Sequence, residues 1–314
     1  MDSMGLPTIH YRQFGEYCQF MPGVTNLVYG SGVMKQIVSA SRRTDIPSFF
    51  PDWFFSRLEA GFVDVANPFN PRQVRRVLLD PASVACFVFW TRDARPMLPR
   101  IGLLSDYPCY FHVTLNRYGP LLEPGGPEID EALESITALA RKVGPQRVIW
   151  RYDPVILTGP FDADWHEHTF RYLASRLVGM VRHVVVSVYD SYRHSDARLR
   201  RHGLKPGPEA DPLLPALVRS LAESADKYSI PLSLCAEPDL AALTGLAIDS
   251  MPACIDAAII EQIAGSTETP FEHVRDNHQR PGCRCMKSVD IGTYGTCPRG
   301  CLYCYASRAR RQSI

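Results

Sequence analysis

Short apolar runs alternate with amphipathic stretches along the chain from residue 36 onward. Each run is four to eight residues long and apolar through most of its length, with many β-branched residues. Runs of this kind are typical of strands that are covered on both faces, as in a parallel sheet. The pattern predicts strands at 36–41, 62–67, 83–90, 109–115, 147–152, 183–189 and 231–236, and a further strand at 287–292.

Three of the stretches between these strands have the pattern of amphipathic helices. The clearest spans 128–144, with acidic residues at its start, basic residues near its end and a closing Gly144, as the helix dipole favours. Residues 164–181 and 211–228 show similar patterns. Alternating strands and helices predict a parallel α/β fold. We expect a TIM-like (β/α) barrel rather than an open doubly wound sheet, because no glycine-rich phosphate turn follows the first strand.

Polar side chains follow each of the first seven predicted strands. In a (β/α) barrel, functional residues lie where strands end and loops begin. These positions hold Arg42, Arg43, Thr44 and Asp45, then Asn67 and Asn70, Thr91 and Arg92, Thr114 and Asn116, Arg151, Tyr152 and Asp153, Tyr189 and Asp190, and Cys235 and Glu237. We therefore expect a functional site at the mouth of the barrel.

The composition indicates a large folded protein and gives little reason to expect a membrane or nucleic-acid role. Of 314 residues, 46% are hydrophobic, and 34 Lys and Arg nearly balance 33 Asp and Glu. No apolar run approaches the roughly 20 residues of a membrane span, and the first residues lack the pattern of a signal peptide. We expect a cytoplasmic protein. Residues 34–314 are predicted to form one barrel domain, and residues 1–33 an extension that is either a disordered arm or a mis-assigned start.

Seven of the ten cysteines lie at or beyond residue 235. In a reducing compartment such a concentration of thiols favours metal binding over disulfides. Cys297, Cys301 and Cys304 have C-x3-C-x2-C spacing in the segment TCPRGCLYCYA. Structural zinc takes four protein ligands, whereas a 4Fe–4S cluster held by three cysteines leaves one iron open to an exchangeable ligand. The triplet therefore favours a cluster, with zinc as the alternative.

This motif, with the aromatic Tyr303 before its last cysteine, resembles that of the radical S-adenosylmethionine enzymes. The resemblance implies that Cys297, Cys301 and Cys304 bind a 4Fe–4S cluster, that S-adenosylmethionine chelates the open iron, and that Tyr303 lies against its adenine. It also implies reductive cleavage to a 5′-deoxyadenosyl radical, with an electron from a donor such as flavodoxin or ferredoxin. No segment matches the GGE-type segment that binds the methionyl amino group in those enzymes.

The position of the motif differs from that in the radical S-adenosylmethionine enzymes, where it follows the first barrel strand. Because the first and last strands of a barrel are neighbours, a circular permutation keeps the cluster at the same mouth. Residues 287–292 would correspond to the first strand of those enzymes and 36–41 to the next. With SASRRTDIPSFF, NPFNP, FWTR and RYDP, the chain is also similar to a bacterial and archaeal family of unknown function that has a C-terminal cysteine cluster.

Four further cysteines indicate a second metal site. Cys283 and Cys285 form the segment GCRC, and Cys235 and Cys254 flank an earlier loop. Four thiols suit an auxiliary iron–sulfur cluster or a zinc ion. The alternative for Cys235 and Cys254 is ordinary burial in the core, and the sequence leaves this choice open.

Arginines at two strand ends indicate an anionic small molecule as substrate. Arg42 and Arg43 can bind carboxylate or phosphate through paired hydrogen bonds, with Asp45 orienting them, and Arg151 with Asp153 can do the same. Simple ion pairs at strand ends are the alternative for both groups.

The leading hypothesis is therefore a radical S-adenosylmethionine enzyme. The near-neutral charge favours a small-molecule substrate over nucleic acid, which stays the second substrate class. A non-enzymatic iron–sulfur electron carrier or sensor and a zinc-stapled barrel hydrolase are the alternative functions. The segment RQVRR at 72–76 is predicted to be the solvated face of a helix rather than a nucleic-acid contact.

Overall fold

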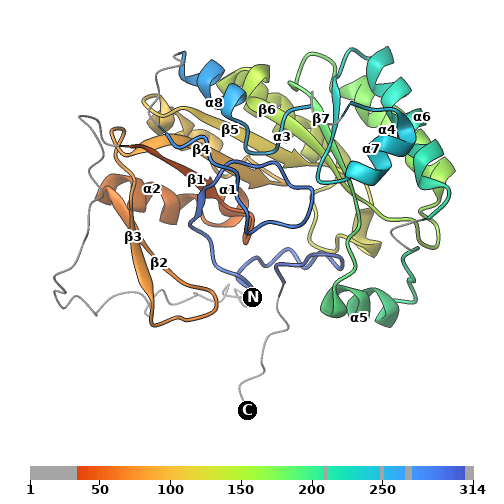
Figure 1. Ribbon diagram of the computed structural model, residues 1–314, viewed down its shortest axis with the longest axis horizontal. Helices are drawn as coiled ribbons and strands as arrows, with labels where there is room; N and C mark the ends of the chain where they lie inside the picture. The colour runs from red at the N-terminus through yellow and green to blue at the C-terminus, as the bar shows by residue number, and fades with distance from the viewer. Residues whose placement is uncertain (1–33, 208–210, 248–250, 266–270, 308–314) are drawn as a thin grey trace, which may run out of the picture. The chain divides into compact units, whose positions relative to one another are not determined.

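The computed structural model describes residues 34–207, 211–247, 251–265 and 271–307, and the predicted N-terminal extension lies outside them. Its main feature is a sheet of seven parallel strands in the order β8-β7-β6-β5-β4-β1-β9 (Figure 1). The strands are β1 Gln36–Ala40, β4 Val84–Thr91, β5 Cys109–Thr114, β6 Val148–Val155, β7 Val184–Val188, β8 Leu232–Leu234 and β9 Val289–Asp290. The predicted parallel α/β fold is confirmed.

The last strand of the sequence lies beside the first. β9 pairs in parallel with β1, in a register that sets Ser39 opposite Asp290. The carboxylate of Asp290 accepts hydrogen bonds from Ser39 Oγ at 2.7 Å and from Ser41 Oγ at 2.6 Å, and so reinforces this short pairing. The neighbour relation predicted for 287–292 and 36–41 is therefore confirmed.

The second predicted strand belongs to a separate hairpin and not to the parallel sheet. The hairpin consists of β2 Phe62–Ala66 and β3 Val74–Leu78, which pair antiparallel. Val63 and Val77 are buried opposite each other, while the neighbouring Asp64 and Arg76 form an exposed ion pair at 2.8 Å. The helix predicted at 72–76 is therefore wrong, because cross-strand pairing with β2 determines the structure of this short segment.

Helices connect the parallel strands. They are α1 Ile46–Phe49, α2 Pro51–Ala60, α3 Ile129–Val143, α4 Ala163–Arg176, α5 Arg193–Arg201, α6 Leu214–Lys227, α7 Pro238–Thr244 and α8 Ala257–Ala264, with 3-10 turns at Leu98–Leu104, Gly119–Leu121 and Pro145–Arg147. The three predicted helices correspond to α3, α4 and α6. α3 begins with a capping box between Glu128 and Glu131, which satisfies backbone N–H groups of its first turn.

Both faces of the parallel sheet are covered, as its apolar strands predict. On one face Phe89, Phe111 and Trp150 belong to a core that includes buried side chains of α2, α3, α4 and α6. On the other face Val88 and Tyr110 pack with α8 and with loop residues on either side of it. β8 and β9 form the two edges of the sheet, and no pairing joins these edges among the described strands. Within the same residues, no helix combines the length and apolarity needed to cross a membrane.

Candidate functional site

A cavity of about 660 Å³ lies at the carboxyl ends of the parallel strands. Residues at or near the ends of six strands line its wall, namely Arg43, Arg92, Thr114, Asp153, Asp190 and Cys235. Parallel strands bring their carboxyl ends to one edge of a sheet, so residues far apart in the sequence meet there. The predicted polar mouth therefore corresponds to a cavity.

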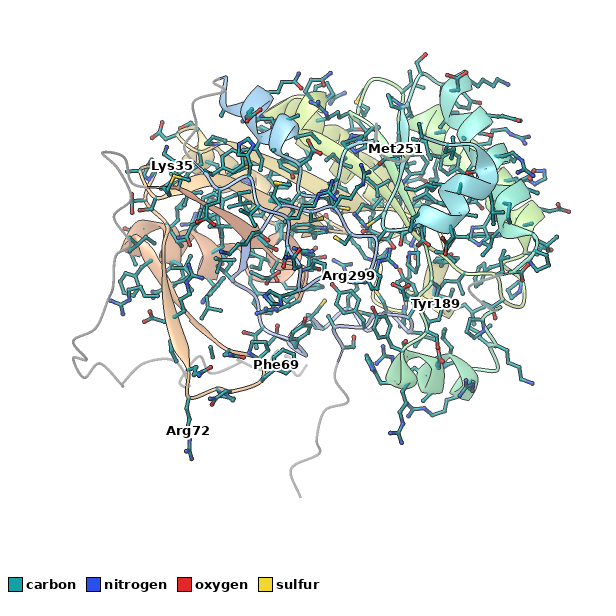
Figure 2. The ribbon with its side chains drawn as sticks, viewed as in Figure 1. Lys35, Phe69, Arg72, Tyr189, Met251 and Arg299 are labelled. Carbon is teal, nitrogen blue, oxygen red and sulfur yellow. The ribbon has the colours of Figure 1, made fainter. Side chains whose placement is uncertain are left out.

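The β2–β3 hairpin contributes to the cavity wall, but not through the strand-end asparagines that were predicted. Asn67 lies in the turn of the hairpin, where its Nδ2 donates to Gln73 Oε1 at 3.0 Å. It does not follow a strand of the parallel sheet. Its neighbours Pro68 and Phe69 line the cavity. Figure 2 shows Phe69 and Arg72 at this turn. The hairpin thus places one exposed aromatic side chain at the cavity.

The cysteine motif forms a loop that follows β9. Cys301 and Cys304 line the cavity, and Cys297 is partly buried at the start of the loop. A backbone hydrogen bond of 2.9 Å from Leu302 N to Leu122 O ties the loop to the segment after β5. The motif thiols are therefore held at the same edge of the sheet as the strand-end residues.

Arg299 anchors the middle of the motif loop. Its Nη2 lies 3.2 Å from Asp45 Oδ2 and 2.7 Å from Ser48 Oγ, and its Nη1 donates to Gly125 O at 3.0 Å. Position 125 requires glycine, because a Cβ there would lie 2.4 Å from the Arg299 carbonyl oxygen. Asp45 also accepts a hydrogen bond from Ser48 N and so caps α1. Its carboxylate therefore connects the first loop of the sheet to the motif.

Arg198 of α5 holds the end of the motif loop. Its Nε donates to Leu302 O at 2.9 Å, its Nη1 to Ser307 O at 3.1 Å, and its Nη2 to Cys304 O. Because one planar guanidinium satisfies three carbonyl groups, it fixes the backbone on both sides of the last cysteine. No spacing signal in the sequence connects Arg198 to the motif, and sequence reasoning missed it.

Cys301 is buried and Cys297 is partly buried, which disfavours the ionised form of these two thiols. Burial raises the pKa of Cys301 to about 12, although the nearby Arg92 cation acts in the opposite direction. Burial also raises the pKa of Cys297. Among the described residues, no three Cys, His, Asp or Glu side chains already surround a common point as metal ligands do. A bound metal would therefore have to displace the thiol protons and draw the sulfur atoms together.

The donor set nevertheless fits an iron–sulfur cluster. Three thiols project from one short loop whose backbone is fixed by Arg198 and Arg299. Arg92 and Arg198 supply positive charge close to Cys301 and Cys304. Cations of this kind stabilise thiolates and the anionic cluster that they would hold.

Tyr303 belongs to a buried charged network beside the motif. Its hydroxyl donates to Glu123 Oε1 and accepts from Arg92, and Arg92 Nη1 lies 2.9 Å from Glu123 Oε1. Asn116 Nδ2 is 3.4 Å from the same hydroxyl. Burial raises the pKa of Tyr303, so the side chain is a neutral phenol. Tyr303 also lines the cavity, whereas Glu123, which sequence reasoning missed, stands in no recognisable motif.

Arg42 and Arg43 both line the cavity after β1. The Arg42 guanidinium lies over the Trp90 ring, 5.4 Å from its centroid. Asp290 accepts a hydrogen bond from Arg42 N at 2.8 Å, and its carboxylate lies 3.9 Å from Arg43 Nε. Asp290 therefore has the place beside the two arginines that was predicted for Asp45, whose carboxylate faces the motif loop instead.

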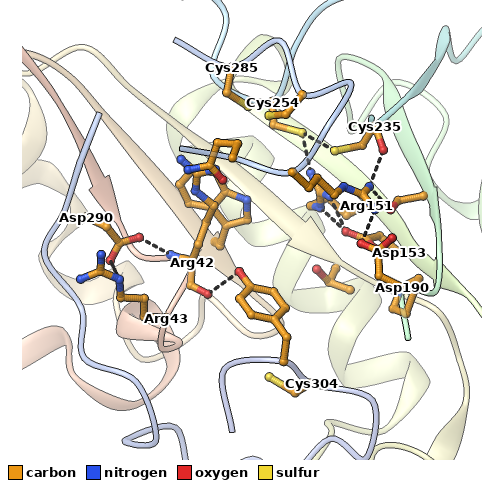
Figure 3. Close-up of a pocket in the computed structure, with 18 of the residues that line it drawn as sticks. Arg42, Arg43, Arg151, Asp153, Asp190, Cys235, Cys254, Cys285, Asp290 and Cys304 are labelled. Carbon is orange, nitrogen blue, oxygen red and sulfur yellow. Dashed lines mark hydrogen bonds and ion pairs between the residues drawn. The ribbon is translucent and has the colours of Figure 1, made fainter. Parts of the chain in front are cut away.

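Arg151 and Asp153 form an ion pair on the cavity wall, with Arg151 Nε 2.9 Å from Asp153 Oδ2 (Figure 3). Arg151 Nη1 also donates to Cys254 Sγ at 3.0 Å. Arg280, a cavity residue that sequence reasoning missed, forms an ion pair with Asp190. Arg151 and Asp153 therefore form the ion pair that the sequence offered as the alternative, and they also line the cavity, where substrate binding by them stays a prediction.

Three of the four further cysteines, Cys235, Cys254 and Cys285, lie on the side of the cavity opposite Cys304 (Figure 3), and Cys283 also lines the cavity. The Sγ atoms of Cys235 and Cys254 are 3.3 Å apart, and Ile255 N donates to Cys285 Sγ at 3.4 Å. Cys254 and Cys285 are also buried in the apolar cluster on this face of the sheet. The four cysteines thus line one cavity, and a metal site formed by them stays a prediction.

The comparisons with known proteins place the chain in a family. A model of the family described as Domain of unknown function (DUF1848) matches residues 37–306. The chain belongs to this family. The matched range of the DUF1848 domain includes nearly the whole parallel sheet and the seven C-terminal cysteines. The comparison with curated proteins found no match.

Proposed function

We propose that this protein is a radical S-adenosylmethionine enzyme in which Cys297, Cys301 and Cys304 hold a 4Fe–4S cluster. The observation that carries the proposal is the position of the three-thiol loop, directly after β9, beside β1 and at the cavity formed by the strand ends. Three cysteine ligands leave one iron open for S-adenosylmethionine. When bound and reduced, the cluster supplies the electron that cleaves S-adenosylmethionine to a radical able to abstract hydrogen. The permuted (β/α) barrel expected from the sequence is part of this proposal.

The residues around the motif have defined tasks in this proposal. Arg198 and Arg299 keep the loop rigid, so that the three sulfur atoms stay in place when the cluster binds. Arg92 lies beside Cys301 and Tyr303 and favours the thiolate form of the ligand. A preorganised loop lowers the entropy cost of binding the cluster.

Tyr303 is the residue proposed to contact the adenine of S-adenosylmethionine. Its hydroxyl is held by Glu123 and Arg92, which fixes the plane of the ring at the cavity wall. A fixed aromatic ring can stack on a heterocycle without losing much conformational freedom.

An anionic small molecule is the proposed substrate class. The cavity of about 660 Å³ is within the usual range of small-molecule sites. The Arg42 guanidinium donates to neutral groups, Gln279 Oε1 at 2.9 Å and Ser288 Oγ at 3.3 Å, at the cavity wall. A partly buried cation held by neutral side chains is a suitable partner for a carboxylate or phosphate. The protein would then align the substrate with the site of radical formation and keep water out.

The test is reductive cleavage by anaerobically purified full-length protein. The protein is reconstituted with iron and sulfide and given S-adenosylmethionine and dithionite, which replaces a flavodoxin or ferredoxin donor. We expect about four iron atoms per chain and formation of 5′-deoxyadenosine, measured by liquid chromatography and mass spectrometry. Cys301→Ala should lose both. Cys109→Ala is the matched control, because Cys109 is a buried thiol on β5, and it should keep both.

The other outcomes separate the alternative functions. An intact cluster that never cleaves S-adenosylmethionine would identify an electron carrier or sensor. Zinc in place of iron at Cys297, Cys301 and Cys304 would reject both the enzyme and the carrier.

A further inference from the structure

Cys235, Cys254, Cys283 and Cys285 meet between the two edges of the parallel sheet. Cys235 directly follows β8, and Cys283 and Cys285 come shortly before β9. β8 and β9 are the two edge strands. The segment at Cys254 contacts both sides, since Cys254 Sγ is 3.3 Å from Cys235 Sγ and the next residue, Ile255, donates its N–H to Cys285 Sγ at 3.4 Å. The four thiols therefore lie between the edge at β8 and the edge at β9, which are not paired with each other among the described strands.

We propose that these four cysteines bind one tetrahedral zinc ion, which fastens the edge at β8 to the edge at β9. The proposal rests on the four thiols alone and does not depend on cluster binding by Cys297, Cys301 and Cys304. Four cysteines in two groups separated by a longer segment are a usual ligand set for structural zinc.

The separation of Cys235 and Cys254 favours a single ion over a four-iron cluster. Zinc–sulfur bonds of about 2.3 Å place neighbouring sulfur atoms of a tetrahedral site about 3.8 Å apart. In a four-iron cluster each cysteine binds a different iron, so the cysteine sulfur atoms lie farther apart. The 3.3 Å between Cys235 Sγ and Cys254 Sγ corresponds to the shorter spacing.

Two of the sulfur atoms accept hydrogen bonds from nitrogen donors. Arg151 Nη1 donates to Cys254 Sγ at 3.0 Å, and Ile255 N donates to Cys285 Sγ at 3.4 Å. Such donors stabilise thiolates and orient metal ligands. An apolar core thiol needs no such set of donors.

The backbone on either side of the site is arranged to bring the two edges close. Gly282, directly before Cys283, has φ +76°, and a Cβ there would lie 2.8 Å from Pro238 Cδ. Arg280 donates to the carbonyl oxygen of Cys235, which ties the segment before β9 to the end of β8. As free thiols Cys235 and Cys254 are hydrogen-bonded to each other, and among the described residues no three of the thiols already surround a common point. Zinc would replace the shared protons and rearrange the sulfur atoms around one centre.

The experiment measures metal content in full-length protein purified anaerobically without added metal. We expect about one zinc ion per chain in the wild type and in Cys301→Ala, which removes a motif ligand only. The Cys283→Ser/Cys285→Ser double variant should lose the zinc. Because that variant risks poor folding, its far-UV circular dichroism is compared with the wild type. Cobalt(II) is also added to metal-free wild type and to metal-free Cys301→Ala, and both should give the visible absorption of a tetrahedral thiolate site.

Three results would overturn the zinc site. The first is an iron content that falls by about four atoms per chain in the double variant, which would identify an auxiliary cluster. The second is zinc that persists in a folded double variant. The third is cobalt(II) that gives no thiolate absorption in the wild type. Since Cys301→Ala keeps its zinc in the expected case, failure of the proposed radical chemistry and failure of the zinc site are distinguishable.

Discussion

Arg299 Nη2 lies 3.2 Å from Asp45 Oδ2, and this ion pair joins the cysteine motif to the first loop of the parallel sheet. The Arg299 side chain is 6% exposed and that of Asp45 is 9% exposed. Neither charge can be solvated by water where it lies, so each depends on the other. The position of the motif loop therefore depends on a residue that follows β1.

Asp45→Asn should destabilise the protein strongly. The substitution keeps the shape of the side chain but leaves the Arg299 cation buried without a counter-charge, which costs about 3–5 kcal/mol of unfolding free energy. Urea unfolding of the full-length protein measures the loss. Asp64→Asn is the control, because it breaks the exposed Asp64–Arg76 pair and should cost less than about 1 kcal/mol. Equal losses in the two variants would show that the buried pair has no special importance.

Tyr303 should contribute to S-adenosylmethionine affinity through its ring. Stacking on an aromatic side chain contributes about 0.5–1.5 kcal/mol, so Tyr303→Ala should raise the dissociation constant roughly 2- to 13-fold. Tyr303→Phe keeps the ring and loses only the hydroxyl contacts with Glu123 and Arg92, so its dissociation constant should stay close to that of the wild type. Anaerobic calorimetry of the reconstituted protein measures both. A Phe variant that binds as weakly as the Ala variant would assign the effect to the hydroxyl network instead.

Arg198 should determine how long the cluster is retained. Arg198→Met removes three hydrogen bonds to carbonyl groups around Cys304, so the loop loosens and iron should be lost faster in air than from the wild type. The decay of the cluster's visible absorption measures the rate. Arg200→Met is the matched control on the same helix, where the arginine side chain is 66% exposed. Identical decay in the two variants would contradict a role of Arg198 in holding the loop.

His166 should make stability depend on pH. Its Nδ1 lies 2.7 Å from the Tyr152 hydroxyl and its Nε2 is 3.1 Å from Ile156 O, so the buried ring is a neutral imidazole that accepts from the tyrosine and donates to the carbonyl. Burial lowers its pKa to about 4. Below about pH 6.5 this histidine is protonated in the unfolded chain but stays neutral in the folded protein. The free energy of unfolding therefore falls as the pH drops from about 6.5 to about 4.

The His166→Gln variant tests this dependence. Wild-type protein should lose about 2–3 kcal/mol more unfolding free energy than the variant between pH 7.5 and pH 4.5, as urea unfolding at the two pH values measures. His183, whose pKa burial lowers to about 3, stays in both proteins and contributes equally. Parallel losses in wild type and variant would mean that His166 does not carry the effect.

The parallel sheet and its polar edge could be predicted from the sequence, because mostly apolar runs indicate strands that are buried on both faces. The same rule assigned residues 62–67 to the parallel sheet, although they belong to the hairpin. An apolar run of that length suits a hairpin as well as a sheet strand, and only the pairing with Val74–Leu78 distinguishes them. The pattern at 62–67 indicated a strand, but not which strand lies beside it.

The sequence by itself determined the motif thiols, the neighbouring positions of β1 and β9, and many residues of the cavity wall. These features depend on local spacing and on the general geometry of parallel strands. Only the tertiary structure decided that Asp45 pairs with Arg299 and Asp290 with Arg43. Hydrogen bonds and ion pairs form between groups that the fold brings within about 3 Å, and such contacts leave no trace in the spacing of residues that are far apart in the sequence.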